Sequence, residues 1–328
     1  ESFREVFSGN SARASVAGMV TDSSGHVYVY GKCKNDVDYF GQTISEGVFL
    51  AKHKPNGDLM WVKNIFKGRT DLDMGDAITI DPENEYVYIV GDFTEEIFVP
   101  GGGSLTPDGN ASLFLIKYDT EGNFVWSKQV DDLIFWSSDL TPDHSGNIIL
   151  TNRVSGSIEI GTKSYQDLMN DILTVKFDAN GNILWSKTAG GEGIEYMGIT
   201  STDRKDNIYL TGEFTSQDVF VGDTSFTLED GDGNVLFSKF DPDGNIQWVK
   251  MHGKSVGQSY TSMDALCWPT GIKTLPNGYS YIKGAHGDSV AFSDTVLNND
   301  YEGNYYATFV GKFNPQGEAV WIHSIDGD

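Results

Sequence analysis

The residues with the most scope for ligand chemistry are aromatic side chains that occur close to carboxylates. Flat aromatic rings stack on the C–H faces of sugars, while carboxylates and amides fix sugar hydroxyl groups. Two of the seven tryptophans, Trp136 and Trp268, depart from the regular spacing of the other five. With a glycan as the expected ligand, the candidate ligand-binding residues are Trp136, Tyr196, Tyr260, Trp268, Asp76 and Glu195. Packing within local loops is the alternative role for each of these rings.

A calcium site is a second candidate, because Ca²⁺ takes clustered oxygen ligands. Asp230, Asp232 and Asn234 alternate with glycines and offer three oxygen-bearing side chains. The segment lacks the sixth-position glycine and the closing glutamate of an EF-hand loop. In a chain with 47 acidic residues, solvated turns are the alternative. No other cofactor is expected.

Signatures of catalysis are weak in this sequence. The run Gly253–Gly257 matches G-x-S-x-G, but a nucleophile elbow needs a strand, a turn and a helix, and no helical pattern follows. The six histidines are scattered and form no H-E-x-x-H pair. A non-enzymatic protein is therefore expected. A hydrolase or lyase, with a cluster of carboxylates or histidines at one site, is the less favoured hypothesis.

Composition and charge exclude several classes of protein. The chain has 328 residues, of which 23 are basic and 47 acidic, giving a net charge of −24. This sign is wrong for binding nucleic acid or an anionic membrane surface. No run approaches the roughly 18 apolar residues of a membrane span, so no membrane insertion is expected. Two cysteines are too few for a disulfide-dense scaffold.

The elements that would position these residues are internal repeats. Five segments share a pattern in which a lysine precedes a tryptophan by nine residues and a glycine precedes it by four. The lysines are Lys52, Lys117, Lys176, Lys239 and Lys312, and the tryptophans are Trp61, Trp126, Trp185, Trp248 and Trp321. Alternating runs rich in Val, Ile and Phe flank a turn such as Asp241–Asn245, which indicates a β-hairpin.

A second hairpin precedes each tryptophan hairpin. Its turn opens with an acidic residue in four repeats, namely Asp22, Asp81, Asp143 and Asp203. A short decorated connection, for example DVFVGDTSFTL, joins the two hairpins. The tryptophans are spaced by 65, 59, 63 and 73 residues, which suits one four-stranded blade per repeat. Radial repetition of such blades is typical of an all-β propeller.

The motif D-x-x-G-N-x-x-W-x-K, followed by an acidic turn and a strand such as I-Y-L-T-G-E-F, resembles the SBBP-type β-propeller repeat. The resemblance covers about residues 8–328 and departs from the pattern at Asn152 and Thr274. It implies a propeller fold, and members of that family are mostly secreted or surface-exposed bacterial proteins. Because the motif contains no catalytic residues, the resemblance implies no activity.

The repeats predict one propeller domain over residues 1–328. The predicted blades are residues 10–68, 69–130, 131–190, 191–253 and 254–328, and a closed five-bladed ring is favoured over a piece of a six- or seven-bladed one. Residues 1–9 resemble the end of a tryptophan strand, which predicts an extra edge or closing strand.

The two cysteines bear on ring closure. Cys33 ends a second strand in the first repeat, and Cys267 begins a first strand in the fifth. Antiparallel neighbours put these strand ends on one face, so a Cys33–Cys267 disulfide could join the first and last blades if their Cα atoms come within about 4.4–6.8 Å. Two buried free thiols are the alternative.

These expectations define the hypothesis for function. The chain is expected to be an extracellular or cell-surface propeller that binds a glycan at one mouth of its central channel. A structural or protein-adhesion module, whose partner would be a surface protein, is the alternative.

Overall fold

The structure is a computed structural model, and it describes residues 7–8, 14–67, 77–108, 112–131, 138–216, 218–227, 234–255, 267–287, 289–292, 295–298 and 306–325. All regular secondary structure in these residues is β-strand. None of the described segments forms a helix long and apolar enough to cross a membrane.

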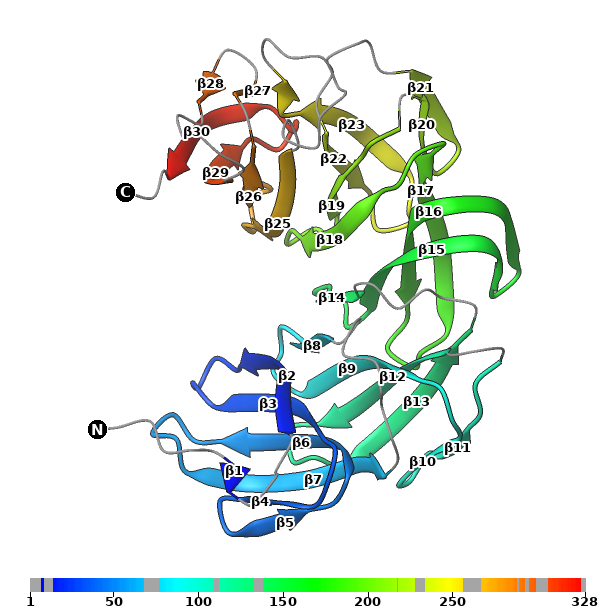
Figure 1. Cartoon of the computed structure of the whole chain (residues 1–328), viewed down its shortest axis with the longest axis vertical. Helices are drawn as coiled ribbons and strands as arrows, with labels where there is room; N and C mark the ends of the chain where they lie inside the picture. The colour runs from blue at the N-terminus through cyan, green and yellow to red at the C-terminus, as the bar shows by residue number, and fades with distance from the viewer. Residues whose placement is uncertain are drawn as a thin grey trace.

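Five four-stranded antiparallel units, here called blades 1 to 5, follow one another along the chain (Figure 1). Blade 1 contains β2 (Ala14–Thr21), β3 (Val27–Cys33), β6 (Gly47–His53) and β7 (Leu59–Lys67). Blade 2 contains β8 (Ala77–Ile80), β9 (Tyr86–Phe93), β12 (Ser112–Asp119) and β13 (Phe124–Val130). Blade 3 contains β14 (Ser138–Pro142), β15 (Ile148–Ile160), β16 (Lys163–Phe177) and β17 (Ile183–Gly191). Blade 4 contains β18 (Tyr196–Thr202), β19 (Ile208–Glu213), β22 (Val235–Phe240) and β23 (Ile246–His252), and blade 5 contains β25 (Cys267–Thr274), β26 (Ser280–His286), β29 (Ala307–Phe313) and β30 (Ala319–Ile325).

The connections inside the blades form small hairpins of their own. They are β4 (Val37–Tyr39) with β5 (Gln42–Ile44), β10 (Ile97–Val99) with β11 (Gly103–Leu105), β20 (Asp218–Val221) with β21 (Thr224–Thr227), and β27 (Val290–Phe292) with β28 (Thr295–Leu297). In blades 2 and 4 this hairpin pairs with the outer strand of the preceding blade, β10 with β7 and β20 with β17. In blade 5, β27 pairs with β24 (Lys254–Ser255), which follows the outer strand of blade 4.

The N-terminal segment takes the same place at blade 1. Strand β1 (Phe7–Ser8) pairs with β4, as the end of an outer strand pairs with the connection of the next blade elsewhere. The pairing of Phe7 and Ser8 is therefore the pairing that the end of a tryptophan strand makes in other blades.

The blades lie along an open arc, with β2, β8, β14, β18 and β25 on its concave side and both termini beside the opening (Figure 1). Blades 1 and 5 form the two ends, and no described strand of one pairs with a strand of the other. The all-β propeller architecture predicted from the repeats is confirmed. The number of blades in a complete ring stays a prediction.

A repeated contact, here called the clamp, joins consecutive blades. At the junction of blades 2 and 3, the Trp126 indole N–H and the Lys117 ammonium both donate to the Ala179 carbonyl, at 3.0 and 3.1 Å. Trp185 and Lys176 bind the Pro242 carbonyl of blade 4 in the same way, at 3.0 and 3.1 Å. At the other two junctions one member of the lysine–tryptophan pair donates, Lys52 to the Thr120 carbonyl and Trp248 to the Pro315 carbonyl. At the first of these, Lys63 also donates to the Gly122 carbonyl of the same turn.

Of the two possibilities for the cysteines, the structure shows two buried free thiols and no Cys33–Cys267 disulfide. Cys33 packs with Val37 and Tyr39 of its own blade, whereas Cys267 packs with residues of blades 4 and 5. Because the first and last blades lie at opposite ends of the arc, the two thiols belong to separate hydrophobic clusters. Burial raises the pKa of the Cys33 thiol to about 11 and that of Cys267 well above its ordinary value.

Candidate functional site

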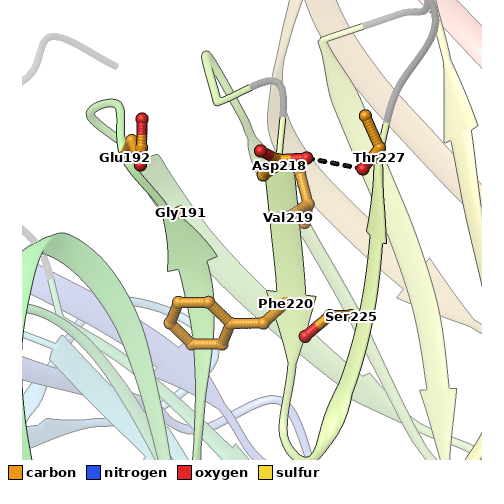
Figure 2. Close-up of a pocket in the computed structure, with 7 residues that line it drawn as sticks. All are labelled: Gly191, Glu192, Asp218, Val219, Phe220, Ser225 and Thr227. Carbon is orange, nitrogen blue, oxygen red and sulfur yellow. Dashed lines mark hydrogen bonds between the residues drawn. The ribbon is translucent and has the colours of Figure 1, made fainter.

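A pocket of about 430 Å³ lies where the connection hairpin of blade 4 joins the outer edge of blade 3 (Figure 2). Three antiparallel strands supply its walls, namely β17, β20 and β21. The lining residues are Gly191, Glu192, Asp218, Val219, Phe220, Ser225 and Thr227. Because the strands are hydrogen-bonded to one another, the side chains in the pocket are held on a regular scaffold.

Alternation along β20 decides which of its side chains are accessible at the pocket. Val219 and Val221 are buried, whereas Asp218 and Phe220 point to the opposite face of the strand and remain accessible. Phe220 pairs with Ser225 across the hairpin, and Asp218 pairs with Thr227. The Thr227 hydroxyl donates to the Asp218 carboxylate at 2.5 Å, which fixes that carboxylate (Figure 2).

Glycines on β17 leave room beside these side chains. A Cβ atom on Gly191 would collide with the Asp218 carbonyl oxygen, and one on Gly190 would collide with the Asp171 carboxylate. Gly190 is the cross-strand partner of Phe220, so no side chain competes with the phenyl ring for that position. Only glycine therefore permits this close packing of β16, β17 and β20.

Three buried carboxyl groups lie in the same part of the molecule. The Glu195 side chain is fully buried, and its Oε1 accepts a hydrogen bond from the Ser216 hydroxyl, whereas no hydrogen bond to Oε2 is found among the described residues. Burial, together with the nearby Asp171 carboxylate, raises the pKa of Glu195 to about 7. Burial also raises the pKa of Asp171 to about 6 and that of Glu213 to about 7.

These carboxyls predict a pH-dependent stability. An acid whose pKa is higher in the folded than in the unfolded chain binds its proton more tightly in the fold, so stability falls as the pH rises. For Glu195 the fall should begin near the ordinary pKa of 4.5 and level off above about 7. Because a tenfold change in proton affinity corresponds to about 1.4 kcal/mol, we expect a loss of roughly 1–3 kcal/mol from this residue. Urea unfolding between pH 4.5 and 8 measures it.

Glu195→Gln is the matched variant, because it keeps the shape of the side chain without a charge. Its unfolding free energy should vary less with pH than that of the wild type, with the difference largest above pH 7. Equal pH profiles for the two proteins would mean that Glu195 ionises as readily in the fold as in the unfolded chain.

Sequence reasoning missed a position that carries a buried charged residue in four of the five blades. It follows the last glycine or asparagine of the second strand. The charged residues are Lys32, Asp92, Arg153 and Glu213, whereas blade 5 has Ala285. The Lys32 ammonium lies 3.7 Å from the Asp92 carboxylate, and both side chains are almost fully buried. Arg153 lies 5.2 Å from the centre of the Tyr196 ring, and burial lowers its pKa. The sequence does contain a signal for this position, because the charge of the residue changes sign from each repeat to the next over the first four repeats.

The structure describes three of the predicted ligand-binding residues. Tyr196 is 37% exposed, and Trp268 is half-buried with its ring 4.6 Å from the more exposed Tyr306. Glu195 has no exposed surface, and its contact with a ligand stays a prediction. Lying outside the described residues are Trp136, Tyr260 and Asp76.

Of the predicted calcium ligands, only Asn234 belongs to the described residues, since Asp230 and Asp232 lie outside them. Asn234 is buried, and its amide nitrogen donates to the Phe214 carbonyl at 3.2 Å. In the described part of the chain, no group of three or more His, Cys, Asp or Glu side chains is placed to hold a metal ion.

No family model matches the chain. It is 23% identical, over 238 residues, to the uncharacterised WD repeat-containing protein L264 of Acanthamoeba polyphaga mimivirus. This match covers 60% of the chain but only 16% of the length of the viral protein.

Solved structures resemble the chain at low similarity. A protein of unknown function from Bacteroides caccae is 8% identical with a TM-score of 0.45, and the match covers 97% of this chain and 83% of that one. The Pan2 WD40 domain of Neurospora crassa is 9% identical with a TM-score of 0.41, covering 95% and 65%. An apocarotenoid oxygenase of Synechocystis is 11% identical with a TM-score of 0.43, covering 92% and 58%. None of these likenesses supports an argument about function.

Proposed function

We propose that this chain is a non-enzymatic binding module which holds a carbohydrate in the pocket between blades 3 and 4, and that it acts outside the cell or at its surface. The pocket itself is the observation that carries this proposal. Its volume of about 430 Å³ lies within the ~300–1,000 Å³ typical of small-molecule sites. Phe220 offers an aromatic face, while Glu192, Asp218 and Thr227 offer acceptors and a hydroxyl at the rim.

Charge narrows the class of ligand. With a net charge of −24 and two carboxylates on the pocket, the chain repels anions. A neutral sugar avoids this repulsion, and its hydroxyls can donate to the carboxylates. The proposal therefore specifies an uncharged glycan rather than an acidic one.

Burial of the perturbed acids argues against catalysis. A hydrolase or lyase needs an acid or base within hydrogen-bonding reach of its substrate. Glu195 is fully buried and Glu213 is 7% exposed, although their pKa values of about 7 would otherwise suit that role. The described carboxyls with raised pKa values are better explained as parts of the blade 3 and blade 4 packing.

A glycan array followed by calorimetry with the best ligand tests the proposal. Phe220→Ala should weaken binding about tenfold, since a stacked aromatic ring contributes about 1–1.5 kcal/mol. Asp218→Asn should also weaken binding, because it removes the charged acceptor. Phe98→Ala is the matched control, because Phe98 is a 62% exposed residue in the corresponding hairpin of blade 2.

The aromatic residues predicted from the sequence form the second arm of the same experiment. If Tyr196→Ala or Trp268→Ala abolishes binding while Phe220→Ala leaves it intact, the glycan site lies at the blade ends and the pocket assignment is wrong. A folded protein that binds no neutral glycan would overturn the proposed function and leave the structural or adhesion role.

A further inference from the structure

Blade 5 presents the tryptophan and lysine donors of a clamp, here called the donor half, but the described residues contain no carbonyl that accepts from them. Tyr281, Lys312 and Trp321 are cross-strand partners on one face of blade 5, as Tyr209, Lys239 and Trp248 are in blade 4. Among the described residues, no carbonyl accepts a hydrogen bond from Trp321 or Lys312. Tyr281 is only half-buried, whereas Tyr28, Tyr88 and Tyr209 at the same position are 0–1% exposed.

The first blade carries the matching acceptor half. Its tryptophan-hairpin turn, Lys54–Asp58, corresponds to the turns that the clamp engages in blades 2 to 5. In those four turns a Cβ atom added to the glycine would lie against the tryptophan of the preceding blade, for example 2.8 Å from the Trp185 ring at Gly244. Gly57 has the same left-handed backbone, with φ of 89°, but no described atom lies within 4 Å of its Cβ position.

Part of the surface beside this turn is apolar and exposed. Met19, Val29, Ala51 and Val62 are cross-strand partners on the face of blade 1 that points away from blade 2. Met19 is 66% exposed and Val62 is half-buried, whereas Val29 and Ala51 are already buried within this chain. The corresponding row in blade 2 includes Ile89 and Ile116, which are fully buried against blade 1.

We propose that the free face of blade 5 binds the free face of blade 1 in a second copy of this chain. Trp321 and Lys312 of one copy would donate to the Pro55 carbonyl of the other, and the indole of Trp321 would cover Gly57. The contact is head-to-tail, so it joins two unlike faces and leaves each copy with one further face to use.

Fixed geometry at the junctions favours a second copy over closure within one chain. The arc is open, and each of its four junctions holds the clamp at donor–acceptor distances of 3.0–3.1 Å. Bringing blade 5 onto blade 1 of the same copy would require all four packed junctions to change together, and packed interfaces do not deform continuously. Docking of a second copy leaves all four unchanged.

Strand β1 fits this arrangement. At three of the four junctions, the connection hairpin of one blade pairs with the outer strand of the blade before it or with that strand's continuation. At blade 1 this pairing is already made by β1. An incoming blade 5 therefore needs to supply only the clamp and the apolar contact.

Sedimentation velocity over a range of protein concentrations tests the proposal. The wild type should associate as its concentration rises. Trp321→Ala removes the donor face, and Gly57→Asn fills the acceptor face while keeping a residue that tolerates the left-handed backbone. Each variant alone should weaken association at least tenfold. Leu184→Ala, at a 53% exposed position on blade 3, is the control and should associate like the wild type.

Mixing the two variants gives the decisive result. Gly57→Asn retains an intact blade 5 face and Trp321→Ala retains an intact blade 1 face, so a 1:1 mixture should recover dimers and nothing larger. A mixture that stays monomeric overturns the proposal. So does a wild type that is monomeric at every concentration while Trp321→Ala lowers its melting temperature, because that result indicates closure within one copy.

Discussion

Replacing Lys176 by methionine is expected to lower the free energy of unfolding by about 3–5 kcal/mol. The Lys176 side chain is 2% exposed, and its ammonium lies 2.9 Å from the Asp143 carboxylate and donates to the Pro242 carbonyl of the next blade. Methionine keeps the length of the side chain but leaves the Asp143 charge buried without its cation. The loss arises mainly from that uncompensated charge. Urea unfolding at neutral pH measures the change.

The chain contains a matched control for this prediction. Lys187, on the outer strand of blade 3, forms an ion pair of 2.8 Å with Asp223, whose side chain is 94% exposed. Lys187→Met should cost at most about 1 kcal/mol, because solvent screens an exposed pair. Similar losses for the two variants would show that burial does not distinguish the two ion pairs.

Replacing Gly244 by alanine is expected to destabilise the protein by about 2–4 kcal/mol, the second large effect. Its backbone has φ of 82°, where a Cβ atom costs about 1–2 kcal/mol. The added methyl would also lie 2.8 Å from the Trp185 ring of the preceding blade. Moving that indole disturbs the clamp, and overpacking of this kind adds about 1–3 kcal/mol. Urea unfolding of the variant and the wild type measures the difference.

Gly57→Ala isolates the backbone part of this cost. Gly57 has φ of 89° at the same position of its turn, with open space around its Cβ position. Gly57→Ala should therefore lower the free energy of unfolding by only about 1–2 kcal/mol. The measurement is made at a low protein concentration, where copies remain separate. If the free energy of unfolding falls by the same amount in both glycine variants, packing by Trp185 contributes nothing measurable at Gly244.

Much of the fold could be predicted from particular residues. The spacing of Lys176 to Trp185, repeated five times, identified the outer hairpin of each blade, because a lysine and a tryptophan on paired strands must share one face. Asp143 identified the turn of the inner hairpin, where its carboxylate accepts hydrogen bonds from the Ser145 and Asn147 amides. Hydrogen bonding of this kind depends only on residues that are close together in the chain. The turn can therefore be predicted from a single sequence.

The candidate site was much less predictable. The pocket depends on Gly191 and Phe220, which belong to different blades and meet only because β20 pairs with the outer strand of blade 3. Glu195 was expected at a ligand, yet the Ser216 hydroxyl and the packing of blades 3 and 4 enclose it. Neither outcome follows from local pattern, since both require contacts between residues more than twenty positions apart.

By itself, the sequence determined the repeated four-stranded blade, its turns and the face that each lysine and tryptophan share, because β-strand alternation and turn chemistry act over a few residues. Only the tertiary structure decided that the blades form an open arc in which, among the described residues, the clamp donors of blade 5 meet no acceptor and the turn glycine of blade 1 is uncovered. The curvature of that arc is set by side-chain packing at four junctions between blades. Packing between distant segments leaves no periodic signal in the sequence.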